Sequence, residues 1–145
     1  MEGFVYSATF TPDLKQGGFA VTFTDLPEAI TQGENVKDAL FHAADCLEEA
    51  IANRIVMGLA IPEPSPLKKG QYAITLHAQM AAKAALYMAI KEIGITKVEL
   101  ASRLDCDEKE VRRLLDPHHS SKLFRIEAAL HVIGKQLIVG LQEAV

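Results

Sequence analysis

Apolar and polar residues alternate with a period of two near the start of the chain, which is the pattern of half-buried β-strands. Phe4–Phe10 and Phe19–Phe23 both show this alternation, and residues 12–18 between them include proline, aspartate and glycine, so we expect a hairpin. Residues 29–32 form a short candidate third strand, and residues 72–76 alternate again. The pattern therefore predicts a small sheet to which a late strand returns.

The period changes to that of a helix after Asn35. Asn35 is suited to cap this helix, and Asp38 occupies the third helical position, where a carboxylate is favourable. Apolar residues then recur every three or four positions: Val36, Leu40, Ala43, Leu47, Ala50 and Ile51. One helical stripe is therefore expected to pack on the sheet, as in a layered α+β domain.

A proline-rich connection at residues 61–70 follows this helix and divides the chain. Three prolines within five residues fix the backbone in extended geometry and remove hydrogen-bond donors, so neither a helix nor a central strand is expected there. Because the strand at residues 72–76 returns to the first sheet, we predict one domain at residues 1–76 and a second at residues 77–145.

The second half has helical periodicity throughout most of its length. Residues 77–93 predict a long alanine-rich helix, and residues 121–133 predict another. Residues 137–139 form a short run of β-type residues near the end of the chain. Together these patterns predict an all-helical second domain.

Residues 96–115 between those helices predict a helix, a tight turn and a second helix. Leu100, Ala101 and Leu104 form the apolar side of the first helix, and residues 105–107 break the periodicity before Val111. Ala101 matters because a bulkier side chain there would separate the two helices. This layout is that of a helix-turn-helix, which places its second helix in the DNA major groove. Asp105 occupies a turn position where such motifs favour glycine, although aspartate tolerates a left-handed backbone.

Candidate DNA contacts lie on and around the second of these helices. Arginine can donate two hydrogen bonds to guanine, either type of cation can contact phosphate, and Glu108 could accept from cytosine or simply repel phosphates. His118 belongs to a histidine pair that suits a plain loop or a phosphate contact, and no third metal ligand lies nearby in the sequence. The predicted DNA-binding residues are Lys97, Glu108, Lys109, Arg112, Arg113, His118 and Lys122.

Charge is distributed unevenly over the 145 residues, whose net charge is −4. Residues 1–76 contain five basic and ten acidic residues, whereas residues 77–145 contain ten and nine. The second half is not strongly basic, so we expect modest DNA affinity per subunit and hence a homodimer or a higher homo-oligomer. Asp38, Asp45 and Glu49 share the helix face opposite the apolar stripe, either as a solvated surface or as a patch that attracts a basic partner.

Composition limits the class of protein. The chain is 49% hydrophobic and 23% charged, which is typical of a folded soluble protein, and its apolar runs are too short to span a membrane. No secretory signal is visible, and the two cysteines lack metal-ligand spacing, so we predict a cytoplasmic protein with free thiols, no structural zinc and no cofactor.

Several short motifs make the chain resemble the HicB family of antitoxins, in its long form with a C-terminal helix-turn-helix. Residues 17–23 begin a strand with the family's paired glycines, and residues 25–34 fit the pattern D-x-P-x-x-x-T-x-G-E. The run I-P-E-P-S at residues 61–65 and the H-H-x-x-K run at residues 118–122 also match. The resemblance extends over nearly all of residues 4–140.

The resemblance implies a fold and two activities. The first domain is expected to be a partial ribonuclease-H-like β-β-β-α-β fold that blocks a HicA-type toxin, which is a small basic ribonuclease with a catalytic histidine. The second domain is expected to dimerise and to repress its own operon by binding operator DNA. We accordingly predict Asp38, Asp45 and Glu49 as toxin-binding residues.

Two other functional classes remain open at this stage. One is a stand-alone transcriptional regulator whose first domain senses a ligand or another protein. The other is a ribonuclease-H-type enzyme, which would need carboxylates on its central strand to hold metal ions. Phe4–Phe10 contains no carboxylate, and Glu48 and Glu49 lie on the helix alone, so we predict no catalytic residues and no metal site.

Overall fold

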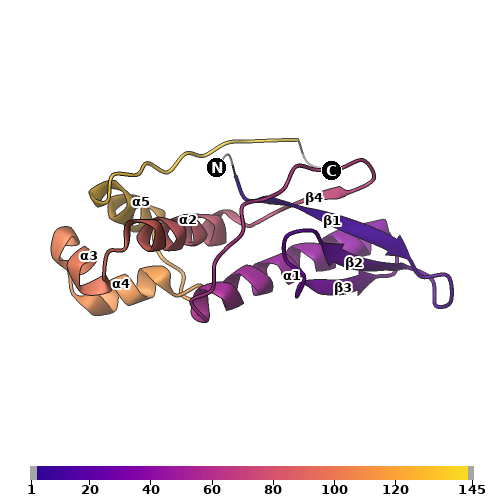
Figure 1. Ribbon diagram of the computed structural model, residues 1–145, viewed down its shortest axis with the longest axis horizontal. Coiled ribbons are helices and arrows are strands. Elements are labelled where there is room, and N and C mark those ends of the chain that lie inside the picture. Colours follow the sequence, from indigo (N-terminus) through magenta and orange to yellow (C-terminus); the bar gives the residue numbers. More distant parts are fainter. Residues whose placement is uncertain (1–2, 144–145) are drawn as a thin grey trace. The chain divides into compact units, whose positions relative to one another are not determined.

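The computed structural model describes residues 3–143 (Figure 1). Within these residues, four strands and five helices follow one another in the order β1-β2-β3-α1-β4-α2-α3-α4-α5. The fold is therefore α+β, as predicted. The chain divides into two compact units between Ala81 and Ala82.

The four strands of the first unit form one antiparallel sheet in the order β3-β2-β1-β4. Phe10 of β1 lies opposite Val21 of β2, and Tyr6 of β1 lies opposite Ile74 of β4. The predicted hairpin and the predicted return strand are therefore both confirmed. The strands are β1 (Val5–Pro12), β2 (Phe19–Phe23), β3 (Ile30–Gly33) and β4 (Tyr72–Thr75).

Helix α1 (Val36–Val56) packs against β2, β3 and β4 (Figure 1). Asn35 caps it as predicted, because its side chain accepts a hydrogen bond of 2.9 Å from the backbone N–H of Asp38. A methyl group on Gly33 would lie only 2.3 Å from the backbone nitrogen of Ala39, so glycine is required where the helix approaches β3. The buried side of the helix consists of Ala39, Ala43, Leu47, Ala50, Ile51, Ala52 and Ile55.

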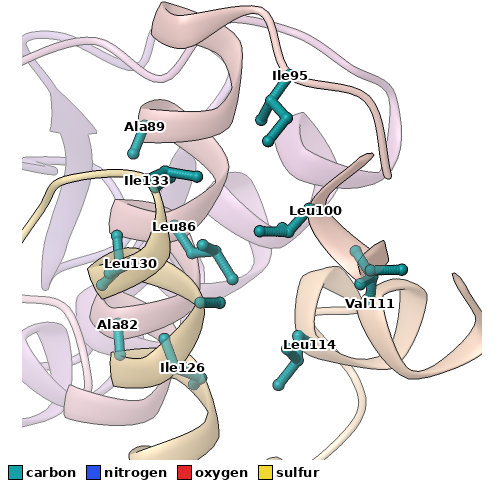
Figure 2. Close-up of a cluster of buried hydrophobic side chains, with 12 residues drawn as sticks. Ala82, Leu86, Ala89, Ile95, Leu100, Val111, Leu114, Ile126, Leu130 and Ile133 are labelled. Carbon is teal, nitrogen blue, oxygen red and sulfur yellow. The ribbon is translucent and has the colours of Figure 1, made fainter. Parts of the chain in front are cut away.

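The second unit contains most of α2 (Ala78–Ile93) and all of α3 (Lys97–Leu104), α4 (Glu108–Leu115) and α5 (Leu123–Val132). Apolar side chains from all four helices gather in one buried cluster (Figure 2). Its members are Ala82, Leu86, Ala89, Ile95, Leu100, Ala101, Val111, Leu114, Ile126, Ala129, Leu130 and Ile133. Helices α3 and α4 together thus contribute their apolar sides to a core with α2 and α5.

The connection between α3 and α4 is a tight turn, as the break in periodicity predicts. Asp105 adopts the left-handed conformation, with φ 54° and ψ 47°, and the N–H of Cys106 donates to the carbonyl of Ala101 over 3.0 Å. Ala101 is 4% exposed at the place where a small side chain was expected. Thr96 and Asp107 cap the two helices through hydrogen bonds from the N–H groups of Glu99 and Glu110.

The run of β-type residues near the end of the chain adds no strand to the second unit within the described residues, in keeping with the prediction of a helical domain. Residues 137–139, which have β-type side chains, form no strand, and Ile138 is 87% exposed. A strand requires a partner with which to exchange hydrogen bonds, and β propensity alone does not supply one. None of the helices that the structure describes is long and apolar enough to cross a membrane.

Candidate functional site

Helix α4 is a two-turn helix with one buried side and one cationic side. Val111 and Leu114 are 0% and 3% exposed and point into the core of the second unit (Figure 2). Lys109, Arg112 and Arg113 are exposed, and we refer to these three residues as the cationic face of α4. Such a face offers charged donors in fixed relative positions, which suits phosphate oxygens or the acceptor edges of bases.

Two carboxylates on α4 form ion pairs, one with an arginine of the cationic face and one with an arginine of α5. Glu108 accepts a hydrogen bond of 2.8 Å from Nη2 of Arg112, one helical turn further on. Glu110 instead accepts from Nε and Nη2 of Arg125 on α5, at 2.9 and 2.6 Å. The Glu110 carboxylate is thereby paired with α5, whereas Glu108 holds Arg112 along the exposed side of the helix.

The remaining predicted DNA-binding residues lie close to helix ends in the second unit. Lys97 is the exposed first residue of α3, and Lys122 stands at the N-cap position of α5, with Nζ 5.9 Å from the centre of the Phe124 ring. His118 is exposed, its N–H donates to Asp116 over 2.9 Å, and its Nδ1 lies 3.8 Å from the same carboxylate. The exposure of all three residues is compatible with contacts to an external phosphate.

Lys83 is a residue that the hydrophobic pattern did not predict as functional. It is 0% exposed, although the amine of a lysine almost always reaches solvent. Its Nζ donates to the carbonyls of Arg113 and Leu114 at 2.9 and 3.0 Å and to Oγ of Ser121 at 2.8 Å. Burial lowers the pKa of the Lys83 ammonium, and the charge of Asp116 opposes that shift. The available signal was a lysine spaced three residues from Met80 and from Leu86, on an otherwise apolar stripe.

The predicted acidic residues of the first unit lie on α1, but they differ in their surroundings. Asp38 accepts a hydrogen bond of 2.8 Å from the N–H of Glu34 and lies 3.2 Å from Nε2 of His42, so it helps to close the N-terminus of the helix. Asp45 and Glu49 are exposed. We refer to Asp38, Asp45 and Glu49 as the acidic face of α1.

A polar hollow of about 330 Å³ lies beside the start of that helix. Its walls come from the β1–β2 turn, from β2 and β3 and from the first turns of α1, including Asp13, Phe19, Glu34 and His42. Asp38 also lines it. The hollow and the acidic face of α1 therefore adjoin each other at this side chain.

The motif residues at 25–34 and 61–65 contact each other directly. The carboxylate of Asp25 accepts a hydrogen bond of 2.8 Å from the N–H of Ser65 and a second, short one from its hydroxyl. The hydroxyl of Tyr6 donates to the carbonyl of Pro62 over 2.7 Å. These bonds hold the proline-rich connection against β1 and against the turn that follows β2.

A further contact joins the same region to the end of α1. The guanidinium of Arg54 binds both carboxylate oxygens of Glu28, at 2.6 and 2.9 Å, and donates to the carbonyl of Ala60 over 2.8 Å. The hydrogen bonds from Arg54 lower the pKa of the Glu28 carboxyl group. The motif residues of the first unit thus have structural roles within that unit.

Comparisons with known proteins identify related chains. Residues 5–85 match the family described as HicB-like antitoxin of bacterial toxin–antitoxin systems. The protein named Antitoxin HicB from Escherichia coli K12 is 37% identical over 132 residues, which are 91% of this chain and 95% of that protein. Antitoxin HicB 1 from Photorhabdus laumondii is 33% identical over 94% of this chain and 86% of its own length. Antitoxin HicB from Pseudomonas fluorescens is 30% identical over 88% of each chain.

Proposed function

The chain belongs to the HicB-like family of bacterial antitoxins, and we propose from this premise that it has two binding activities on two separate units. The first unit neutralises a HicA-type ribonuclease toxin by covering the toxin's active site. The second unit binds the operator of its own operon and represses it. In this proposal the chain itself carries out no chemistry.

The first unit supports toxin binding through its fold and its charge. Its antiparallel sheet with one helix across it fits the partial ribonuclease-H-like domain expected from the family resemblance. Residues 1–76 contain twice as many acidic as basic residues, and Asp45 and Glu49 expose carboxylates on α1. A ribonuclease that binds RNA is basic, so opposite charge accelerates its association with this surface and disfavours acidic competitors.

The second unit supports DNA binding through the arrangement of α3 and α4. We interpret α3, the turn at Asp105 and α4 as a helix-turn-helix with α4 as its recognition helix. The observation that carries this interpretation is that α4 buries Val111 and Leu114 while its opposite side exposes three cations. Arg112 and Arg113 would contact bases or phosphates, while Lys97, His118 and Lys122 would contact the flanking backbone.

The proposed repressor acts as a homodimer or a higher homo-oligomer. The second unit is close to electrically neutral, so a single copy offers few net charges to DNA. A two-fold axis would place two copies of α4 about one DNA turn, roughly 34 Å, apart on a palindromic operator.

Replacement of Arg112 with alanine tests the DNA-binding half of this proposal. The change is expected to weaken operator binding by about 1–3 kcal/mol and to leave toxin inhibition intact, because Arg112 lies in the second unit. Titration of the duplex upstream of the gene measures the loss. Arg103→Ala is a matched control, because Arg103 also pairs with a glutamate one turn away, on α3. Equal losses for Arg103→Ala and Arg112→Ala would count against α4 as the recognition helix.

A further inference from the structure

The amino group of Lys83 is buried and fully engaged in hydrogen bonds. A lysine ammonium has three N–H donors, and three acceptors lie within 3.0 Å of Nζ: the carbonyls of Arg113 and Leu114 and the hydroxyl of Ser121. No buried polar side-chain atom lacks a partner within residues 3–143. Lys83 therefore forms a complete polar connection inside an otherwise apolar region of the second unit.

The three acceptors lie in two neighbouring segments, which are the last turn of α4 and the connection between α4 and α5. The carbonyls of Arg113 and Leu114 are among the last four of the helix, which have no partner within it, and a cation there also interacts favourably with the helix dipole. Ser121 lies in the segment of residues 116–122 that leads to α5. A single side chain of α2 thus bonds to both segments.

These segments carry most of the cations that the proposed function assigns to DNA. Arg112 and Arg113 lie in the last turn of α4, and Lys122 lies in the segment that contains Ser121. An apolar side chain at position 83 could fill the same volume, but it would not fix the direction of the two carbonyls or of the serine. Directional bonds define one arrangement, whereas apolar packing alone tolerates several.

We propose that Lys83 is a positioning residue for DNA recognition, and this inference rests on the proposed function. Its ammonium holds the last turn of α4 and residues 116–122 in the one arrangement in which their cations match an operator. Lys83 itself touches no DNA. Its removal therefore affects discrimination between DNA sequences more than it affects attraction to DNA in general.

The test compares Lys83→Met with Lys91→Met in the full chain. Both changes remove one positive charge from α2, but Lys91 is exposed, with Nζ 5.4 Å from the centre of the Tyr87 ring. Binding is measured to the duplex upstream of the gene and to a scrambled duplex of equal length. We expect the affinity of Lys83→Met for the upstream duplex to fall roughly tenfold or more. Its affinity for the scrambled duplex should stay within about twofold of that of Lys91→Met, because both variants carry the same net charge.

Amide hydrogen exchange without DNA gives a second readout that does not depend on the proposed function. The N–H of Asp116 donates to Arg113 and the N–H of His119 donates to Asp116. We expect both amides to exchange several-fold faster in Lys83→Met and at the wild-type rate in Lys91→Met. The amide of Leu100, which donates to Thr96, should stay protected in both variants if the unit remains folded.

The outcomes separate the inference from its premise. If Lys83→Met matches Lys91→Met in exchange and in sequence discrimination, the positioning role is overturned. If wild-type protein does not prefer the upstream duplex, the proposed DNA recognition fails, and the exchange data alone decide whether Lys83 orders this segment. If Lys83→Met unfolds the unit, Ser121→Ala replaces it, and wild-type discrimination in that variant would overturn the part of the inference that concerns residues 116–122.

Discussion

Asp105 turns the chain from α3 into α4 with a left-handed backbone, which costs most residues free energy but costs aspartate less. We expect Asp105→Gly to change the free energy of unfolding by less than about 1 kcal/mol. Asp105→Val should lower the free energy of unfolding by about 1–3 kcal/mol, because a β-branched side chain is strained in this conformation. Urea unfolding of both variants measures the difference. Equal stabilities for glycine and valine would contradict the conformation assigned to this turn.

Tyr6 is a residue at which pH should affect stability. It is 0% exposed, its hydroxyl donates to Pro62, and burial together with the nearby charge of Asp25 raises its pKa to about 12. An unfolded tyrosine ionises near pH 10, so the contribution of the neutral phenol is complete below pH 10 and is lost as pH rises to about 12. This change lowers the free energy of unfolding by about 2–3 kcal/mol.

Tyr6→Phe isolates this effect, because every other titrating group is unchanged. At pH 7 the variant should be about 1 kcal/mol less stable than wild type, since the hydrogen bond to Pro62 is lost. Between pH 10 and 12 the difference should shrink and then reverse. Urea unfolding at several pH values measures it, and a difference that is constant with pH would exclude the buried phenol as its source.

At the scale of elements, helix α1 carries the charge assigned to toxin binding. Asp45 and Glu49 are exposed, whereas Asp38 is engaged at the helix N-terminus. The double variant Asp45→Lys/Glu49→Lys is therefore expected to slow association with a basic toxin by roughly tenfold or more at low salt. Stopped-flow association rates test this expectation, and the effect should diminish as ionic strength rises.

Lys15→Glu/Lys37→Glu is the matched control for this helix, because it reverses the same number of charges at exposed positions of the first unit. We expect it to preserve or accelerate association. Equal slowing by both double variants would show that unfolding or general damage, and not charge, is responsible.

Periodicity predicted the helices and strands of both units, because each of these elements has an apolar side that must be buried. Residues 137–139 show that β propensity alone makes no strand, because they have no partner strand among the described residues. Periodicity also missed Lys83. A hydrophobic pattern indicates which positions face the core, but it does not indicate where buried carbonyls can accept hydrogen bonds from a polar side chain. Asp38 was expected at the helix N-terminus and on a binding face; the structure confirms the first role, because its carboxylate accepts from the N–H of Glu34, and the second stays a prediction.

At the scale of the whole molecule, the proposed division of labour follows the division of the chain into two units. Residues 1–76 are acidic and residues 77–145 are nearly neutral with three exposed cations on α4. The proposal thus gives a basic protein and a DNA duplex different surfaces on one chain. The chain belongs to a family of bacterial antitoxins, and the proposed partners are a HicA-type toxin, operator DNA and further copies of the chain.

The most direct test assays one set of full-length proteins for both activities. Inhibition of the ribonuclease encoded beside the gene and binding to the upstream duplex are measured for wild type, Arg112→Ala and Asp45→Lys/Glu49→Lys. The account predicts that Arg112→Ala weakens DNA binding alone and that the double variant weakens toxin inhibition alone. If either variant lost both activities while its melting temperature stayed at the wild-type value, the two surfaces would not be separable and the account would be contradicted.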